Sequence, residues 1–161
     1  MAMNIYHAAS EAFAQRRFKD SIVLIQTALE RVNTINELSP WLMLLAQSYI
    51  ELGERQSAID SIIQACRLGS DHARSMAIDW CQRERDSGEW ADAISLGRQI
   101  LDADWVNHRI ARELIDLLLM CGRHIEALEI YKQQHMMSPI IEAKYNNIFT
   151  NLKETHNLNA E

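Results

Sequence analysis

GEWADAI, residues 88–94, is one of four copies of a seven-residue pattern in this chain of 161 residues. The other copies are GERQSAI at 53–59, GRHIEAL at 122–128 and RRFKDSI at 16–22, the last without a glycine. Each copy has one small residue at its sixth position: Ser21, Ala58, Ala93 and Ala127. These four positions lie 37, 35 and 34 residues apart. A repeat of about 34 residues is typical of an array of helix-turn-helix units.

The composition agrees with a helical array. Two prolines and five glycines leave few turn signals, which favours long helices over strands. Hydrophobic residues make up 48% of the chain and charged residues 24%, as in soluble globular domains. A chain of this length fits one domain with a continuous core. We therefore expect a single all-α domain over residues 1–161.

The charge balance limits the classes of partner. Sixteen basic and 22 acidic residues give a net charge of −6, whereas binding to nucleic acid needs a basic surface. No apolar run reaches the ~18 residues of a membrane span, and no basic segment followed by an apolar run opens the chain. We expect a cytoplasmic protein that binds neither nucleic acid nor membrane.

Residues that could carry chemistry are scattered. Cys66, Cys81 and Cys121 are odd in number and widely spaced, which favours buried free thiols in a reducing compartment. The six histidines have no metal-binding spacing, and neither a phosphate-binding glycine loop nor a serine nucleophile motif is present. We expect no catalytic residue, no metal, no cofactor and no enzymatic activity.

Two serine-proline pairs predict helix starts, because serine caps free amides and proline fits the first helical position. Ser39 and Pro40 predict a helix that runs over 41–52. Ser138 and Pro139 predict a final helix to about residue 155, before a frayed tail at 156–161. The first helix is expected over 4–15.

The third helical pair departs most from the others. Glu84 occupies an inward position on its first helix, and Gly97 lies in the middle of its second, at a cost of about 1 kcal/mol relative to alanine. We expect Trp80, Trp90 and Trp105 to fill the missing volume. On that expectation, Trp90→Ala should cost roughly 3–5 kcal/mol.

Several of these stretches resemble the tetratricopeptide repeat family. Residues 42–49 (L-x2-L-A-x2-Y) and 111–118 (A-x2-L-I-x2-L) are similar to the family's first-helix pattern. Residues 127–131 (A-x3-Y), followed by Pro139, are similar to its second-helix pattern. The weaker second-helix matches are 21–25, 58–62 and 93–97. The resemblance implies an α-solenoid of four hairpins, at about 2–38, 39–73, 74–107 and 108–141, with a capping helix at about 139–155.

The resemblance also implies a right-handed superhelix with a concave groove, lined by the first helix of each hairpin. That inner face maps onto twelve positions: Tyr6, Ser10, Phe13, Met43, Gln47, Ile50, Ile78, Gln82, Arg85, Arg109, Arg112 and Asp116. Some members of the family clamp a partner's terminal carboxylate with lysine, asparagine and arginine on this face. Only Arg112 has a matching charge here, which argues against such a clamp.

A non-catalytic interaction module that binds a peptide or helix of another protein is the function these features favour. Met43 and Ile50 would make an apolar end of the groove, and arginines a basic end. The alternative for the arginines is pairing with nearby carboxylates: Asp79, Asp86, Glu113 and Asp116.

The alternative function is self-association, through the N-terminal helix. The chain is similar in size to bacterial secretion chaperones built on these repeats, and such arrays also precede some glycosyltransferase domains. The chain could therefore be an accessory or chaperone-like subunit of a larger assembly.

Overall fold

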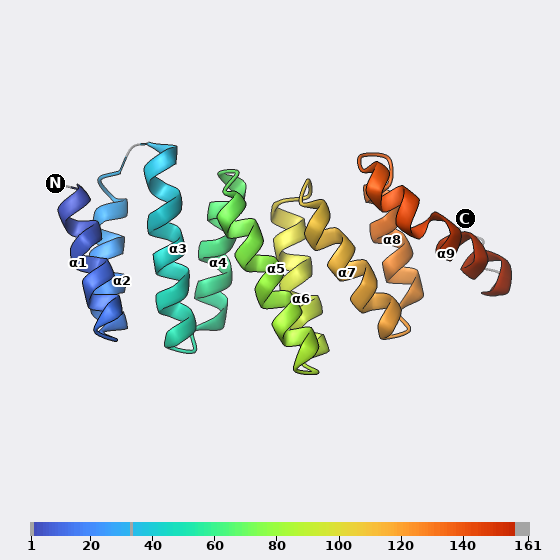
Figure 1. Ribbon diagram of the computed structural model, residues 1–161, viewed down its shortest axis with the longest axis horizontal. Helices are drawn as coiled ribbons and strands as arrows, with labels where there is room; N and C mark the ends of the chain where they lie inside the picture. The colour runs from blue at the N-terminus through green and yellow to red at the C-terminus, as the bar shows by residue number, and fades with distance from the viewer. Residues whose placement is uncertain (1, 33, 157–161) are drawn as a thin grey trace. The chain divides into compact units, whose positions relative to one another are not determined.

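The computed structural model describes residues 2–32 and 34–156. These residues form nine helices and no strand, which confirms the all-α class (Figure 1). The helices are α1 (Ala2–Ala14), α2 (Phe18–Leu29), α3 (Ile35–Glu51), α4 (Arg55–Arg67), α5 (Asp71–Asp86), α6 (Trp90–Ala103), α7 (His108–Met120), α8 (His124–Gln134) and α9 (Pro139–His156).

The two serine-proline pairs behave differently. Pro139 is the first residue of α9, and the Ser138 hydroxyl accepts a hydrogen bond from the Ile141 amide at 3.4 Å, as predicted. The predicted start at Ser39 is wrong, because α3 begins at Ile35 and contains Pro40. Proline in an early turn removes one amide donor without ending the helix here.

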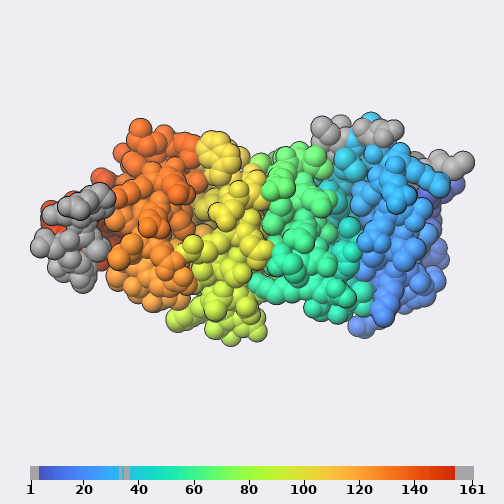
Figure 2. All heavy atoms as spheres, turned by 180° about the vertical axis from the view of Figure 1, so that it is seen from behind, coloured from blue at the N-terminus to red at the C-terminus, as the bar shows by residue number. Residues whose placement is uncertain are grey.

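The packing of the chain divides into two compact units within α5. The first unit runs to Met76 and contains α1–α4; the second runs from Ala77 and contains the rest of α5 and α6–α9. Within each unit, helices that are consecutive in the sequence pack against one another, as in a helical-repeat protein. Side chains fill the space between the neighbouring ribbons of each unit (Figure 2). The superhelix and the repeat boundaries stay predictions.

The four sequence copies form the same turn. One residue in each copy has a left-handed backbone, with φ between 60° and 79°: Arg16, Gly53, Gly88 and Gly122. The amide of the next residue donates to the carbonyl oxygen five residues earlier, at 2.8 or 2.9 Å in every copy. This bond satisfies a carbonyl that the end of the first helix leaves without an intrahelical donor.

The small residue after each turn is buried in every copy. Ser21, Ala58, Ala93 and Ala127 are all 0% exposed. The residue twelve positions earlier, on the facing helix, is also 0% exposed in every copy: Ala9, Ala46, Cys81 and Ile115. Two of these pairs are hydrogen bonded, since the Ser21 hydroxyl donates to the Ala9 carbonyl at 2.9 Å and the Cys81 thiol donates to the Ala93 carbonyl at 3.4 Å. The four copies therefore occupy equivalent places in their hairpins.

Gly97 allows a close approach between α6 and α7. A Cβ atom at Gly97 would lie 3.3 Å from Cδ1 of Leu114, so Leu114 occupies the space that a side chain would take. Two of the three tryptophans predicted to fill this space do not. Trp90 and Trp105 are 40% and 57% exposed, and the Trp90 indole donates to the Arg85 carbonyl at 3.1 Å. The cost predicted for Trp90→Ala from core burial is therefore too high.

The capping helix α9 buries residues four positions apart. Ile141, Tyr145 and Phe149 are buried, whereas Ile148, expected on the same face, is 40% exposed. Four-residue spacing keeps the first three on one stripe, and a residue three positions from Tyr145 lies toward its edge. The tail beyond His156 lies outside the described residues.

We predict that Gly122→Ala destabilises the protein by about 1 kcal/mol, because alanine disfavours the left-handed backbone. No atom lies within 4 Å of the added Cβ, so the cost comes from the backbone alone. Urea unfolding followed by circular dichroism measures it. The matched control is Arg16→Gly, which puts glycine at the same position of the first hairpin and should not destabilise. Equal unfolding midpoints for Gly122→Ala and the unmodified protein would contradict the turn's role.

Candidate functional site

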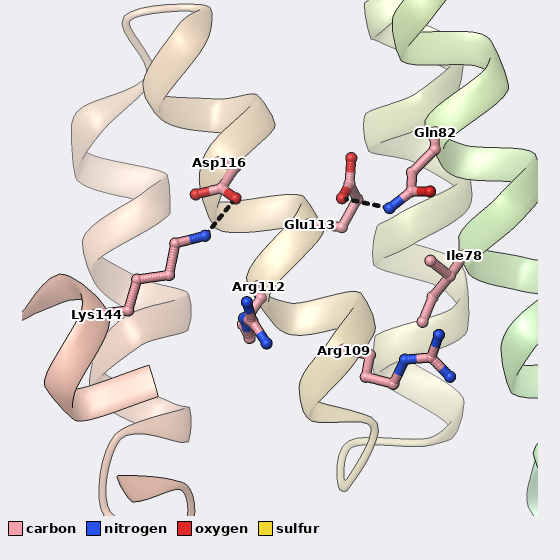
Figure 3. Close-up of a pocket in the computed structure, with 7 residues that line it drawn as sticks. All are labelled: Ile78, Gln82, Arg109, Arg112, Glu113, Asp116 and Lys144. Atoms are coloured by element: carbon pink, nitrogen blue, oxygen red, sulfur yellow. Dashed lines mark hydrogen bonds and ion pairs between the residues drawn. The ribbon is translucent and has the colours of Figure 1, made fainter. Parts of the chain in front are cut away.

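A polar hollow of about 150 Å³ lies in the second unit, between α5, α7 and α9 (Figure 3). Its lining residues are Ile78, Gln82, Arg109, Arg112, Glu113, Asp116 and Lys144. Five of these seven are among the predicted groove residues. The structure therefore brings five of the twelve predicted groove residues together around one hollow.

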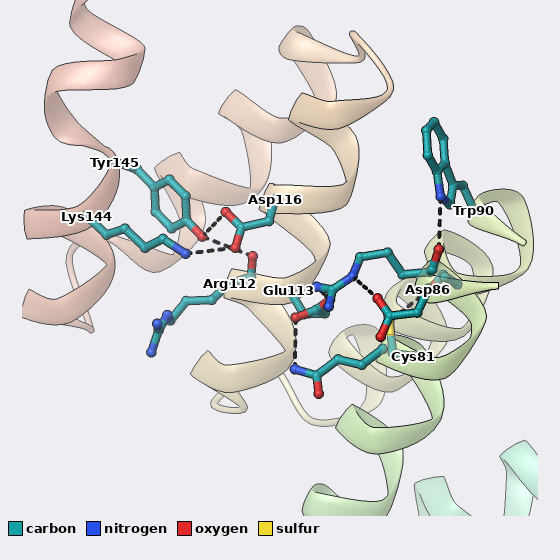
Figure 4. A network of polar contacts seen from close by, with 11 residues as sticks. Cys81, Asp86, Trp90, Arg112, Glu113, Asp116, Lys144 and Tyr145 are labelled. Carbon is teal, nitrogen blue, oxygen red and sulfur yellow. Dashed lines mark hydrogen bonds and ion pairs between the residues drawn. The ribbon is translucent and has the colours of Figure 1, made fainter. Parts of the chain in front are cut away.

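The first carboxylate of the hollow already has partners. Glu113 on α7 is buried and forms an ion pair with the Arg85 guanidinium of α5. The Gln82 amide donates to the second oxygen of Glu113 at 3.3 Å. Burial opposes ionisation of Arg85, but the hydrogen bond to Asp86 and the charge of Glu113 prevail and raise its pKa. Glu113 thus ties α7 to α5 (Figure 4).

The second carboxylate is held from α9. The Lys144 ammonium donates to one oxygen of Asp116 at 2.7 Å, and the Tyr145 hydroxyl lies 2.7 Å from the other. The same hydroxyl lies 3.0 Å from the Arg112 carbonyl oxygen. Burial and then the hydrogen bond to Asp116 raise the pKa of Tyr145 well above its usual range, so Tyr145 stays a neutral donor. These contacts are drawn in Figure 4.

The cations of the hollow outnumber its anions. Arg109, Arg112 and Lys144 face two carboxylates, and those carboxylates are already bound to Arg85, Gln82, Lys144 and Tyr145. The Nε atom of Arg112 is buried and has no hydrogen-bond partner among the residues that the structure describes. A buried N–H without an acceptor is costly, and a carboxylate oxygen is the acceptor that suits a guanidinium best.

The predicted groove residues of the first unit do not form such a site. Met43 is 4% exposed, which contradicts the expected apolar contact surface. The physical reason is that α3 packs on α1 and α2 as well as on α4, so residues 41–46 are all buried. Ile78 in the second unit is also buried, at 5% exposed, although it lines the hollow.

The remaining first-unit positions are half-buried: Tyr6, Ser10, Phe13, Gln47 and Ile50. Tyr6 packs edge-on against Trp41, with ring centroids 4.9 Å apart, and Phe13 packs against Phe18 at 5.3 Å. Both rings therefore contribute to the packing of the first unit. Self-association through the N-terminal helix stays a prediction.

Two residues that line the hollow were not among the predicted groove residues. Glu113 was expected only as an ion-pair partner, which it is for Arg85, and Lys144 was not singled out. The position of Lys144 beside Tyr145, an expected inward residue of the capping helix, is the sequence signal that could have found it. Asp116 pairs with Lys144 rather than with an arginine.

Within 2–32 and 34–156, no three histidine, cysteine or acidic side chains gather closely enough to hold a metal ion. The three cysteines form no disulfide within the described residues, with Cys66 and Cys81 buried as predicted and Cys121 half-buried. None of the helices in the described part of the chain has the length and apolar character of a membrane span.

No protein-family model matches this sequence. No curated protein matches it either.

We predict that Tyr145→Phe destabilises the protein by about 1–2 kcal/mol, because it removes a buried hydrogen bond and leaves acceptors on Asp116 and Arg112 without their donor. Chemical unfolding at neutral pH measures the loss. The matched control is Tyr131→Phe, where the hydroxyl is 3.5 Å from the Asn146 oxygen and the cost should be smaller. Equal costs for the two variants would contradict the role assigned to Tyr145.

The raised pKa of Tyr145 also predicts a pH dependence. A tyrosine whose folded pKa exceeds its unfolded value contributes stability that is complete below the unfolded pKa of about 10 and lost as the pH rises further. The unmodified protein should therefore lose more stability than Tyr145→Phe above about pH 10. Unfolding midpoints measured across this range test it, and parallel curves would contradict it.

Proposed function

We propose that this chain is a tetratricopeptide-like interaction module, and that its α5–α7–α9 hollow binds an acidic segment of another protein. The hollow contributes a site for a carboxylate side chain, and the neighbouring surface of α5 and α7 accommodates the backbone of the segment. The proposed function is binding alone, without a catalysed reaction.

The observation that carries the proposal is the state of Arg112. Its Nε is buried without an acceptor, while both carboxylates of the hollow are bound by other groups. A carboxylate from outside would complete the hydrogen bonding of this guanidinium without breaking the two ion pairs. Arg109, exposed on the previous turn of the same helix, adds a second positive charge.

The net charge of the chain favours a protein ligand over nucleic acid. The chain as a whole has a net charge of −6, so the positive charge of the hollow is local. Nucleic-acid binding depends on many phosphate contacts along a basic surface. A single short cluster of cations is suited to one or two acidic side chains of a peptide.

The proposal implies that Arg109→Glu together with Arg112→Glu abolishes binding of the acidic partner. Partners are captured from native lysate and the bound segment is mapped on overlapping peptides. The labelled segment is then titrated with each variant by fluorescence anisotropy. We expect a loss in affinity of at least about tenfold, because the substituted glutamates repel the acidic segment that the two arginines attract.

The matched control is Arg31→Glu with Arg67→Glu, which makes the same change in net charge at exposed positions of the first unit. This control should bind like the unmodified protein, and all variants should keep their helical circular dichroism. If the two double variants lose affinity equally, or if the mapped segment has no acidic residue, the proposed site is refuted.

A further inference from the structure

Arg112 has a carboxylate of its own helix within reach. Asp116 follows Arg112 by four residues on α7, and side chains at this spacing are neighbours on one face of a helix. An arginine and an aspartate placed in this way attract each other. Among the described residues, Arg112 and Asp116 nevertheless form no ion pair, and the Nε atom of Arg112 has no hydrogen-bond partner. The structure therefore has to keep the two side chains apart.

Contacts from α9 account for this separation. The Lys144 ammonium donates to one oxygen of Asp116 at 2.7 Å, and the Tyr145 hydroxyl lies 2.7 Å from the other. Each oxygen of Asp116 thus has a partner on α9. Figure 4 shows the Asp116 carboxylate facing Lys144 and Tyr145, while the side chain of Arg112 points away from it.

Lys144 is the charged member of this pair of contacts. Its ammonium also lies 4.9 Å from the centroid of the Tyr145 ring, so it is held between a carboxylate and an aromatic ring. The side chains of Lys144 and Asp116 are 38% and 34% exposed. Salt screens such a half-buried pair less than a fully exposed one. Lys144 is therefore the main electrostatic constraint on the direction of Asp116.

We propose that Lys144 is a positioning residue of the acid-binding site, because its pairing with Asp116 leaves Arg112 open to an acidic ligand. Without Lys144, Asp116 turns toward Arg112 and competes with the ligand for the same guanidinium. This inference rests on the proposed function and adds its regulation. The docking of α9 and the binding of the ligand are then linked, and each favours the other.

Direct contact between Lys144 and the ligand is the alternative, since Lys144 lines the same hollow. The two roles differ in how they depend on Asp116. A direct cation becomes more available once Asp116 is neutral, so substitution of Lys144 then costs more affinity. A residue that acts through Asp116 loses its effect once Asp116 is neutral, so its substitution then costs less.

The test titrates a blocked peptide of glycine and serine with three central glutamates into the full chain by calorimetry. We expect Lys144→Gln to weaken binding about threefold, and Asp116→Asn to bind at least as tightly as the unmodified protein. In the Asp116→Asn background, Lys144→Gln should cost less than about twofold. Lys144→Arg should restore binding. The matched control is Lys153→Gln, which removes the same charge at an exposed position of α9 and should leave binding unchanged.

Three results would overturn the proposal. If Lys144→Gln binds like the unmodified protein, Asp116 does not compete for Arg112. If Asp116→Asn loses as much affinity as Lys144→Gln, the contact matters only for the docking of α9. If Lys144→Gln costs as much or more in the Asp116→Asn background, Lys144 contacts the ligand directly.

A second measurement needs no ligand. Nuclear magnetic resonance follows the Nε–H signal of Arg112 in the peptide-free protein, assigned from Arg112→Lys. Lys144→Gln should shift this signal as a carboxylate acceptor is gained, and Lys144→Gln combined with Asp116→Asn should not. An unshifted signal in Lys144→Gln overturns the inference whether or not the peptide binds. The expected shifts without peptide binding to any variant would support the control of Arg112 by Lys144 and refute the acid-binding function.

Discussion

The hydrogen bond that closes each hairpin is the interaction on which the rest of the structure depends. In each of the four copies, an amide donates back across a left-handed residue to a carbonyl five residues earlier, and the same bond recurs between α4 and α5, from the Ser70 amide to the Ala65 carbonyl across Gly69. This bond ends the first helix and sets the direction of the second, so that a small residue of the second helix meets the first at 0% exposure. A larger residue at that position would hold the two helices apart. The same local rule therefore sets the packing of all four pairs.

The third hairpin keeps this turn but differs from the others at Gly97, four residues after its small residue Ala93. Because Gly97 has no side chain, Leu114 of α7 lies close to the backbone of α6. Leu114 also lines a hollow of about 420 Å³ with residues of α6 and α8, among them the carboxylates Asp102, Glu126 and Glu129. On the side formed by α5, α7 and α9, Glu113 and Asp116 hold the cationic side chains of α5 and α9. One helix, α7, thus contributes to two hollows of opposite charge.

The repeat, the turns and the inward small residues could be predicted because they depend on local sequence alone. The errors concern packing between segments. Ser39 and Pro40 predict a helix start, but local sequence does not show that α3 begins at Ile35. The tryptophans were assigned to a gap that Leu114 fills from the next helix. At the site, the inner face that the family resemblance implies includes five lining residues of α5 and α7 but not Glu113, and the position of Lys144 depends on how α9 docks. Met43 was misjudged because α3 has neighbours on three sides.

Hydrogen exchange at the four hairpin turns tests the account most directly. The amides of Arg17, Glu54, Glu89 and Arg123 each donate across the turn, so all four should be protected. Amides two residues further on precede the first bond within the second helix and should exchange rapidly. Rapid exchange at the four turn amides, or protection at only some of them, would contradict the claim that this chain repeats one hairpin four times.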